Sequence, residues 1–154
     1  MLYLVFQLGP DRFAIQAAQV VEVVPVVNAT HIPRAPLGVA GLFDYHGAPV
    51  PLVDFAQLAL GQPSRKWMST RIVLVNYSDQ SGKAHLLGLL AEHATETMHR
   101  SEGDFIDPGI ATSNTPYLRG VMSDAAGIIQ RVEIQNLFSE TVGGNLFREP
   151  AESI

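Results

Sequence analysis

The chain of 154 residues contains no cysteine, and it is poor in basic residues. The first absence excludes a disulfide framework, a thiol nucleophile and a thiolate metal site. Lysine and arginine number 10 against 15 acidic residues, giving a formal net charge of -5, and Arg65-Lys66 is the only adjacent basic pair. Because nucleic-acid binding requires a basic face, we expect no nucleic-acid partner.

Long apolar runs and catalytic motifs are missing as well. No window of about 18 residues is free of prolines and charges, so we expect no membrane span and no direct membrane insertion. Residues 1–9 lack a basic leader and a cleavage site, and we interpret them as the first strand of a cytoplasmic protein. Phosphate-binding, dinucleotide-binding and hydrolase motifs are absent, and the histidines lack metal-site spacing, so we expect neither cofactor nor metal.

The apolar fraction of 47% is sufficient for one packed domain. Apolar segments separated by turn residues predict strands over 2–8, 13–15, 19–27, 71–77 and 85–90, with 94–98 as a further short candidate. Residues 101–116, broken by prolines and glycine, predict a long loop. Residues 61–69 have a linker composition and contain the only tryptophan.

The segment 32–54 carries the strongest local signal. Two apolar runs, 37–43 and 50–53, flank a glycine-containing turn and predict a β-hairpin. Pro49 and Pro51 cannot donate to a strand ladder, which predicts that the returning strand lies at a sheet edge or a bulge. Asp54 then caps one or two predicted helical turns that end at Gly61.

The chain contains an internal duplication. Gly41 precedes Asp54 by 13 residues, as Gly120 precedes Glu133, so these two copies are 79 positions apart. Nearer the start of each half, Phe13 and Glu22 repeat as Leu87 and Glu96, which are 74 positions apart. We predict a domain over 1–138 with halves at about 2–60 and 70–138, followed by a loose tail at 139–154. Because each half is too small for a robust core, we expect an all-β fold of two related barrels that pack together and could exchange strands.

The duplicated acids raise the question of catalysis. Asp54 and Glu133 supply one carboxylate from each half, as in an aspartic-protease dyad. Such a dyad needs both acids on small-residue loops, whereas each acid here precedes a bulky apolar residue, where a helix-capping role is the simpler explanation. We therefore predict that the protein is not an enzyme. The alternative is a small-ligand-binding or catalytic double β-barrel that uses the groove between the barrels.

A valine-rich segment surrounds Glu22, with valines at positions 20, 21, 23 and 24. Core packing explains most of these valines. Consecutive side chains of a strand point to opposite faces, however, so another layer or a partner protein must cover part of this apolar surface.

Several segments together resemble the CheW family of chemotaxis coupling proteins: LVFQLGPDRFAIQAAQVVEV, IPRAPLGVAGLFDYHGAPVPLVDF, RIVLV, LLGLLAE and YLRGVMSDAAGIIQRVEIQNLF. The resemblance implies two intertwined five-stranded SH3-like barrels with short helical turns, in agreement with the duplication. It also implies a non-catalytic adaptor that couples the cytoplasmic tip of methyl-accepting chemoreceptors to a CheA-type histidine kinase.

The same resemblance assigns the partner-binding residues. Val20 and Glu22 fall on a family segment that contributes partner contacts. The others fall on a GVxNLRG-like motif implicated in receptor and kinase binding: Gly41, Asp44, Tyr45, His46 and Gly47. The turn departs from the family's Asn-Leu-Arg-Gly, because a carboxylate replaces the amide and an imidazole replaces the always-charged guanidinium. This departure predicts a divergent member matched to its own receptor and kinase.

Overall fold

The strands form two five-stranded sheets in a computed structural model that describes residues 1–79, 81–110 and 115–138. The first, here called the β1 sheet, has the order β8 (Glu96–His99), β1 (Leu2–Leu8), β2 (Asp11–Gln16), β10 (Gly127–Val132) and β9 (Leu118–Asp124). The second, the β3 sheet, has the order β3 (Val20–Pro25), β6 (Arg71–Ser78), β7 (Ala84–Ala91), β5 (Ala48–Asp54) and β4 (Val39–Tyr45). The all-β prediction is confirmed.

In the part of the chain that the structure describes, helical structure is limited to short pieces: α1 (Phe55–Leu60), η1 (Ala17–Gln19), η2 (Glu102–Asp104) and η3 (Ile134–Asn136). None of these described helices has the length needed to cross a bilayer. The strand predicted to begin at position 19, and to reach Pro25 at least, begins at Val20 because η1 precedes it, and it ends at Pro25. The strand predicted over 94–98 begins at Glu96. The predicted tail at 139–154 lies outside the described residues.

Each sheet combines strands from both sequence halves. β1 and β2 share a sheet with β8, β9 and β10, whereas β6 and β7 share a sheet with β3, β4 and β5. A parallel pair joins the halves in each sheet, with Arg131 opposite Ala14 and Leu52 opposite Gly88. Arg131 and Leu52 are 79 positions apart and Gly88 and Ala14 are 74 apart, the two offsets of the sequence repeat. The duplication is therefore expressed as reciprocal strand exchange.

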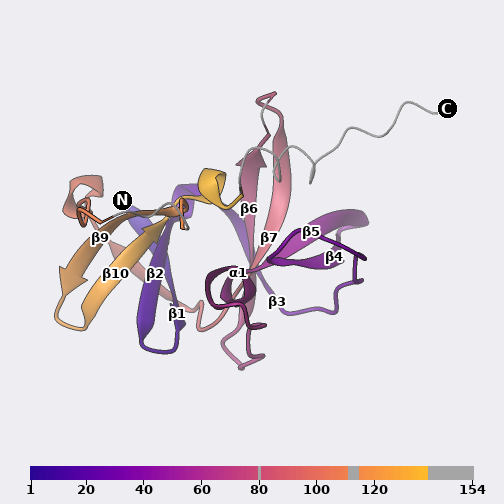
Figure 1. Cartoon of the computed structure of the whole chain (residues 1–154), viewed down its shortest axis with the longest axis horizontal. Coiled ribbons are helices and arrows are strands. Elements are labelled where there is room, and N and C mark those ends of the chain that lie inside the picture. The colour runs from indigo at the N-terminus through magenta and orange to yellow at the C-terminus, as the bar shows by residue number, and fades with distance from the viewer. Residues whose placement is uncertain (80, 111–114, 139–154) are drawn as a thin grey trace.

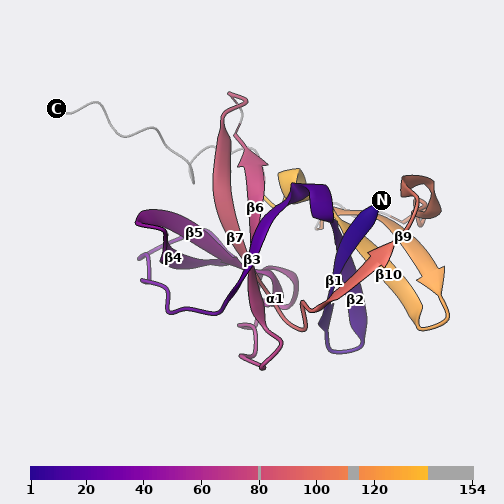
Figure 2. The same ribbon diagram turned by 180° about the vertical axis from the view of Figure 1, so that it is seen from behind.

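The two sheets lie side by side along the molecule (Figure 1). The β1–β2 and β9–β10 hairpins lie on one side of α1, the β4–β5 hairpin lies on the other, and the β6–β7 hairpin projects beyond them. Seen from behind, β3 continues from the β1–β2 hairpin into the other sheet (Figure 2). The β4–β5 turn is thus held at the far end of the β3 sheet.

The main core is shared by both sheets. Phe55, the first residue of α1, is fully buried, and its ring meets Phe6 and Phe13 of the β1 sheet at centroid distances of 4.9 and 5.0 Å. The same cluster contains Val73 and Leu89 of the β3 sheet. Because Phe55 directly follows β5, burial of this ring anchors the base of the β4–β5 hairpin.

Of the two positions predicted for the returning strand, the sheet edge is wrong, since β5 lies between β7 and β4, whereas the β4–β5 ladder does contain a register shift, between Val39 and Gly41. The pairing of β5 with β7 covers only Leu52 to Asp54, so both prolines lie outside that ladder. On the other side, Pro51 lies opposite Leu42, whose backbone N–H and C=O bond instead to Thr30 at 2.9 and 2.7 Å. An interior strand tolerates Pro51 because neither neighbour requires its missing N–H.

Candidate functional site

The β4–β5 turn has a tight two-residue geometry. Tyr45 pairs with Ala48, and the two residues between them, His46 and Gly47, have φ values of 51° and 86°. Two successive positive φ angles are typical of a primed hairpin turn, in which glycine is favoured and histidine is tolerated. The Asp44 carboxylate accepts a hydrogen bond from the Gly47 N–H at 2.9 Å. The turn is therefore a defined structure that presents its side chains to solvent.

Tyr45 connects this turn to the opposite edge of the sheet. Its hydroxyl donates a short hydrogen bond to the carboxylate of Glu22 on β3, which raises the pKa of Tyr45. The His46 ring lies 4.3 Å from the Tyr45 ring at an interplanar angle of 73°. These three side chains, here called the Glu22 patch, bring together three residues that the sequence assigned to partner binding.

Val20 lies elsewhere, because it packs against the main core. A register shift between Val20 and Glu22 interrupts the alternation of β3, and Val21, Glu22 and Val23 are all exposed. The apolar side chains beside the Glu22 patch are thus Val21 and Val23, with exposed fractions of 47% and 40%. Strict alternation could not reveal them, since a bulge changes which residues face outward.

Gly41 has a structural explanation. It is buried at φ 149°, and a Cβ atom built there would lie 2.2 Å from the carbonyl oxygen of Thr30. Gly120 occupies the equivalent place in the other half, where the extended segment around Ile106 crosses β9. Both glycines permit a close backbone crossing, a role that only glycine fills without displacement.

A cavity of about 410 Å³ opens beside the turn. Its lining combines apolar side chains with one carboxylate: Thr30, Leu42, Phe43, Asp44, Gly47 and Pro49. The chemistry of this lining suits an apolar side chain of a partner that also bears a hydrogen-bond donor for Asp44.

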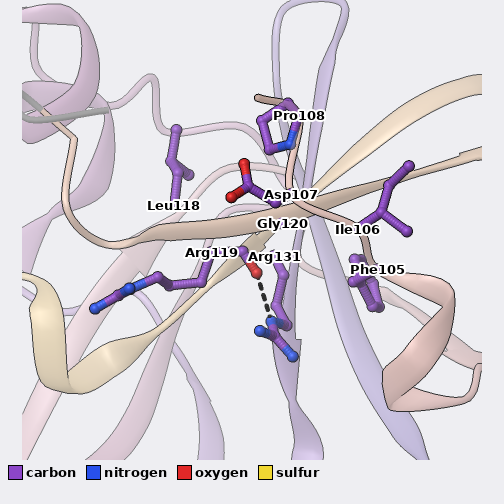
Figure 3. A pocket seen from close by; sticks show the side chains of 8 residues that line it. All are labelled: Phe105, Ile106, Asp107, Pro108, Leu118, Arg119, Gly120 and Arg131. Atoms are coloured by element: carbon purple, nitrogen blue, oxygen red, sulfur yellow. Dashed lines mark hydrogen bonds between the residues drawn. The ribbon is translucent and has the colours of Figure 1, made fainter. Parts of the chain in front are cut away.

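A second cavity of about 260 Å³ lies beside β9 in the β1 sheet. Arg131 donates from Nε to the carbonyl oxygen of Arg119 at 2.9 Å, and its guanidinium lies 5.7 Å from the Phe105 ring centroid. Figure 3 shows the Asp107 carboxylate and the two guanidinium groups pointing in different directions. The lining residues are Phe105, Ile106, Asp107, Pro108, Leu118, Arg119, Gly120 and Arg131.

The turn of the other half has different chemistry at the position of Tyr45, which Asp124 occupies. Asp124 accepts hydrogen bonds from two nitrogens of the Arg12 guanidinium, one at 3.1 Å, and from the Ala126 N–H at 2.8 Å. Arg100 lies 3.7 Å away. The hydrogen bonds from Arg12 are the largest cause that lowers the pKa of Asp124 to about 2. The two turns have therefore diverged, one toward an ion pair and the other toward the Glu22 patch.

The duplicated acids also differ from each other. Asp54 is buried and caps α1, accepting from two N–H groups of its first turn at 3.1 and 3.3 Å, and it also accepts from Ser64. Glu133 makes no capping bond and accepts from Gln19 at 2.9 Å. Both acids stand at the N-cap position, as predicted, but only Asp54 makes capping hydrogen bonds. Across residues 1–79, 81–110 and 115–138, no three histidine, aspartate or glutamate side chains gather closely enough to hold a metal ion.

Comparison with known families decides the membership of the chain. The CheW-like domain family matches residues 2–142, which include both repeat halves. The chain belongs to the CheW-like domain family. The two exchanged sheets described above are thus the fold of a CheW-like domain.

Curated CheW-like proteins share modest identity with the chain. The chemotaxis protein CheW of Rhizobium meliloti is 27% identical over 135 residues, covering 86% of this chain and 84% of the relative. CheW of Helicobacter pylori is 29% identical over 133 residues, covering 83% of this chain and 76% of the relative.

A solved structure has the same fold. The scaffolding protein TtCheW from Thermoanaerobacter tengcongensis superposes with a TM-score of 0.79 at 23% identity, covering 94% of this chain and 92% of that one. At this identity the likeness concerns the fold.

Proposed function

We propose that the protein is a non-catalytic, cytoplasmic adaptor that couples methyl-accepting chemoreceptors to a CheA-type histidine kinase. The family match carries this proposal, because it spans both halves of the duplication. The relatives from Rhizobium meliloti and Helicobacter pylori are chemotaxis proteins, and TtCheW is a scaffolding protein. Neither these comparisons nor the described cavities favour a small-ligand-binding or catalytic double barrel.

The Glu22 patch, together with Asp44 and Gly47, is the contact surface in this proposal. It combines an aromatic ring, an imidazole and a carboxylate at one end of the β3 sheet, with the 410 Å³ cavity beside it. An aromatic anchor surrounded by polar groups is the usual composition of an energetically important contact. Because Glu22 and Asp44 are both acidic, a complementary partner presents a basic group to this surface.

Purified receptor fragment and histidine kinase from the same organism provide the test. We expect receptor-dependent stimulation of kinase autophosphorylation only when this protein is present. We also expect His46→Ala to weaken kinase binding by about tenfold, since truncation of a central contact typically has this effect.

The duplication supplies a matched control for that variant. Ala125 is exposed and holds the position of His46 in the other turn. Ala125→His places the same side chain on the wrong hairpin and should leave kinase binding unchanged. Binding of neither receptor nor kinase by the unmodified protein would contradict the adaptor function.

A further inference from the structure

The only tryptophan of the chain lies on the surface, in the segment that joins the two halves. Trp67 is 44% exposed, and the neighbouring Met68 is 97% exposed. Neither side chain belongs to the described hydrophobic clusters. A large aromatic and a methionine that contribute nothing to a core are typical of a protein contact.

The indole of Trp67 is nevertheless held in one orientation. Its Nε1–H donates to the carboxylate of Glu92, which is buried. The His93 ring stacks on it at a centroid distance of 5.6 Å and an angle of 24°, and Ser69 fixes His93 through a 2.7 Å hydrogen bond to Nδ1. The Arg65 guanidinium lies 5.6 Å from the indole centroid. An exposed but ordered side chain loses little conformational entropy when a partner binds.

The backbone beneath the indole is equally fixed. The Thr70 hydroxyl accepts from the Trp67 N–H at 3.0 Å and donates to the Arg65 carbonyl at 2.7 Å. The Arg71 guanidinium donates to the carbonyl groups of Met68 and Thr70. The segment is therefore an ordered turn, and hydrogen bonds to its backbone hold its exposed side chains in place.

The charge of this turn is opposite to that of the whole chain. Arg65, Lys66 and Arg71 lie within seven positions, although the formal net charge of the protein is -5. The acid that bonds the indole Nε1, Glu92, is itself buried. We define the Trp67 surface as Arg65, Lys66, Trp67, Met68, Arg71 and His93.

We propose that the Trp67 surface binds an acidic amphipathic peptide segment of a partner protein, with an apolar residue seated on Trp67 and Met68 and carboxylates facing the basic residues. Charge complementarity selects this occupant. Stable attachment to a lipid surface usually requires a second signal such as an acyl chain or a long amphipathic helix, and the surface here is a short turn on an acidic protein. The inference goes beyond the adaptor function and does not depend on the Glu22 patch.

Trp67 itself reports the binding, because no other tryptophan contributes to the fluorescence. The probes are two synthetic 16-residue helical peptides with the same leucine stripe, one flanked by glutamates and the other by lysines. We expect a saturable blue shift of the emission with the glutamate peptide, and affinity at least tenfold weaker for the lysine peptide.

Charge reversal tests the assignment to this surface. Arg65 supports the turn through its carbonyl group, so Arg65→Glu with Lys66→Glu should leave the thermal midpoint near that of the unmodified protein. The double variant should prefer the lysine peptide. The Met68 side chain has almost no buried surface, so Met68→Ser should weaken binding of the glutamate peptide several-fold without unfolding the protein. His46→Ala should have no effect.

Three outcomes would overturn the proposal. The first is equal affinity for both peptides, and the second is a charge preference that survives the double reversal. The third is a saturable response to vesicles of phosphatidylcholine with one quarter phosphatidylserine and none to either peptide, which would identify a lipid-binding surface. The receptor and kinase assay is separate, so failure here leaves the adaptor function untouched.

Discussion

The hydroxyl of Tyr45 donates a hydrogen bond to the carboxylate of Glu22, and this contact links β4 to β3, the two outermost strands of the β3 sheet. The β1 sheet has an equivalent link, since Asp124 on β9 lies 3.7 Å from Arg100, which directly follows β8. The outer strands of both sheets are thus connected by side chains, and one member of each pair, Tyr45 and Asp124, holds the same position in the repeat. The same residues that hold the edges in one sheet form the candidate contact surface.

Removing either partner of the Tyr45–Glu22 contact should destabilise the fold slightly, because the contact is exposed to solvent. We expect Tyr45→Phe and Glu22→Gln each to lower the urea midpoint, and the double variant to lower it by less than the sum of the two. A double-mutant cycle followed by Trp67 fluorescence measures this coupling. Additive effects would show that the two side chains do not interact in solution.

The Arg12–Asp124 ion pair predicts a defined acid sensitivity. Hydrogen bonds from Arg12 lower the pKa of Asp124 from 3.8 to about 2, so the folded state favours the carboxylate. The resulting stability is present above pH 4 and is lost as the pH falls through 4 toward 2. Urea unfolding across this range should show that the free energy of unfolding falls less steeply with pH in Asp124→Asn than in the unmodified protein. Arg12→Gln should have the same effect, because it removes the hydrogen bonds that lower the pKa of Asp124. If both variants lose stability between pH 4 and 2 as steeply as the unmodified protein, this assignment is contradicted.

Substitution of the two crossing glycines should separate a structural role from a contact role. Gly41→Ala places a Cβ atom 2.2 Å from the Thr30 carbonyl oxygen, and Gly120→Ala places one 3.3 Å from the Phe105 Cβ. We expect destabilisation of about 3 kcal/mol or more for Gly41→Ala and roughly 1–2 kcal/mol for Gly120→Ala.

Gly127→Ala is the control for those two variants. Gly127 has a φ of 119°, and a Cβ atom added there would meet no other atom within 4 Å, so only backbone strain applies, roughly 1 kcal/mol. Chemical denaturation gives all three values. A Gly41→Ala variant that is fully stable yet fails to bind the kinase would instead make Gly41 a direct contact.

The sequence predicts the duplication, because glycines and acids recur at fixed offsets. Strand exchange is one of the arrangements that the sequence allows, since each half is too short for a robust core of its own. The Tyr45–Glu22 contact could not be predicted, because it depends on how far the sheet curves between two strands that do not pair. The exposure of Val21 and Val23 follows from a bulge that the run of valines does not reveal.

The different fates of Asp54 and Glu133 show a further limit of the repeat pattern. Their positions are equivalent, but Ser64 lies close enough to bond Asp54, whereas Gln19 from the other end of the chain bonds Glu133. Ser64 comes from the segment between the halves, ten positions after Asp54, whereas Gln19 comes from the opposite half to Glu133. The equivalent positions of Asp54 and Glu133 therefore do not predict an equivalent side-chain role, because that role depends on a neighbour supplied by another part of the chain.

His46 allows the turn and the partner contact to be tested separately. Asparagine adopts a positive φ more readily than histidine and is preferred before glycine in this type of turn. We therefore expect His46→Asn to raise the free energy of unfolding by at most about 0.5 kcal/mol, measured by urea denaturation. The same variant should bind the kinase more weakly, because it removes the imidazole beside Tyr45, and His46→Arg should shift preference toward kinases whose surfaces complement a guanidinium. Unchanged or tighter binding of His46→Arg to every kinase and receptor would show that this position does not select the partner.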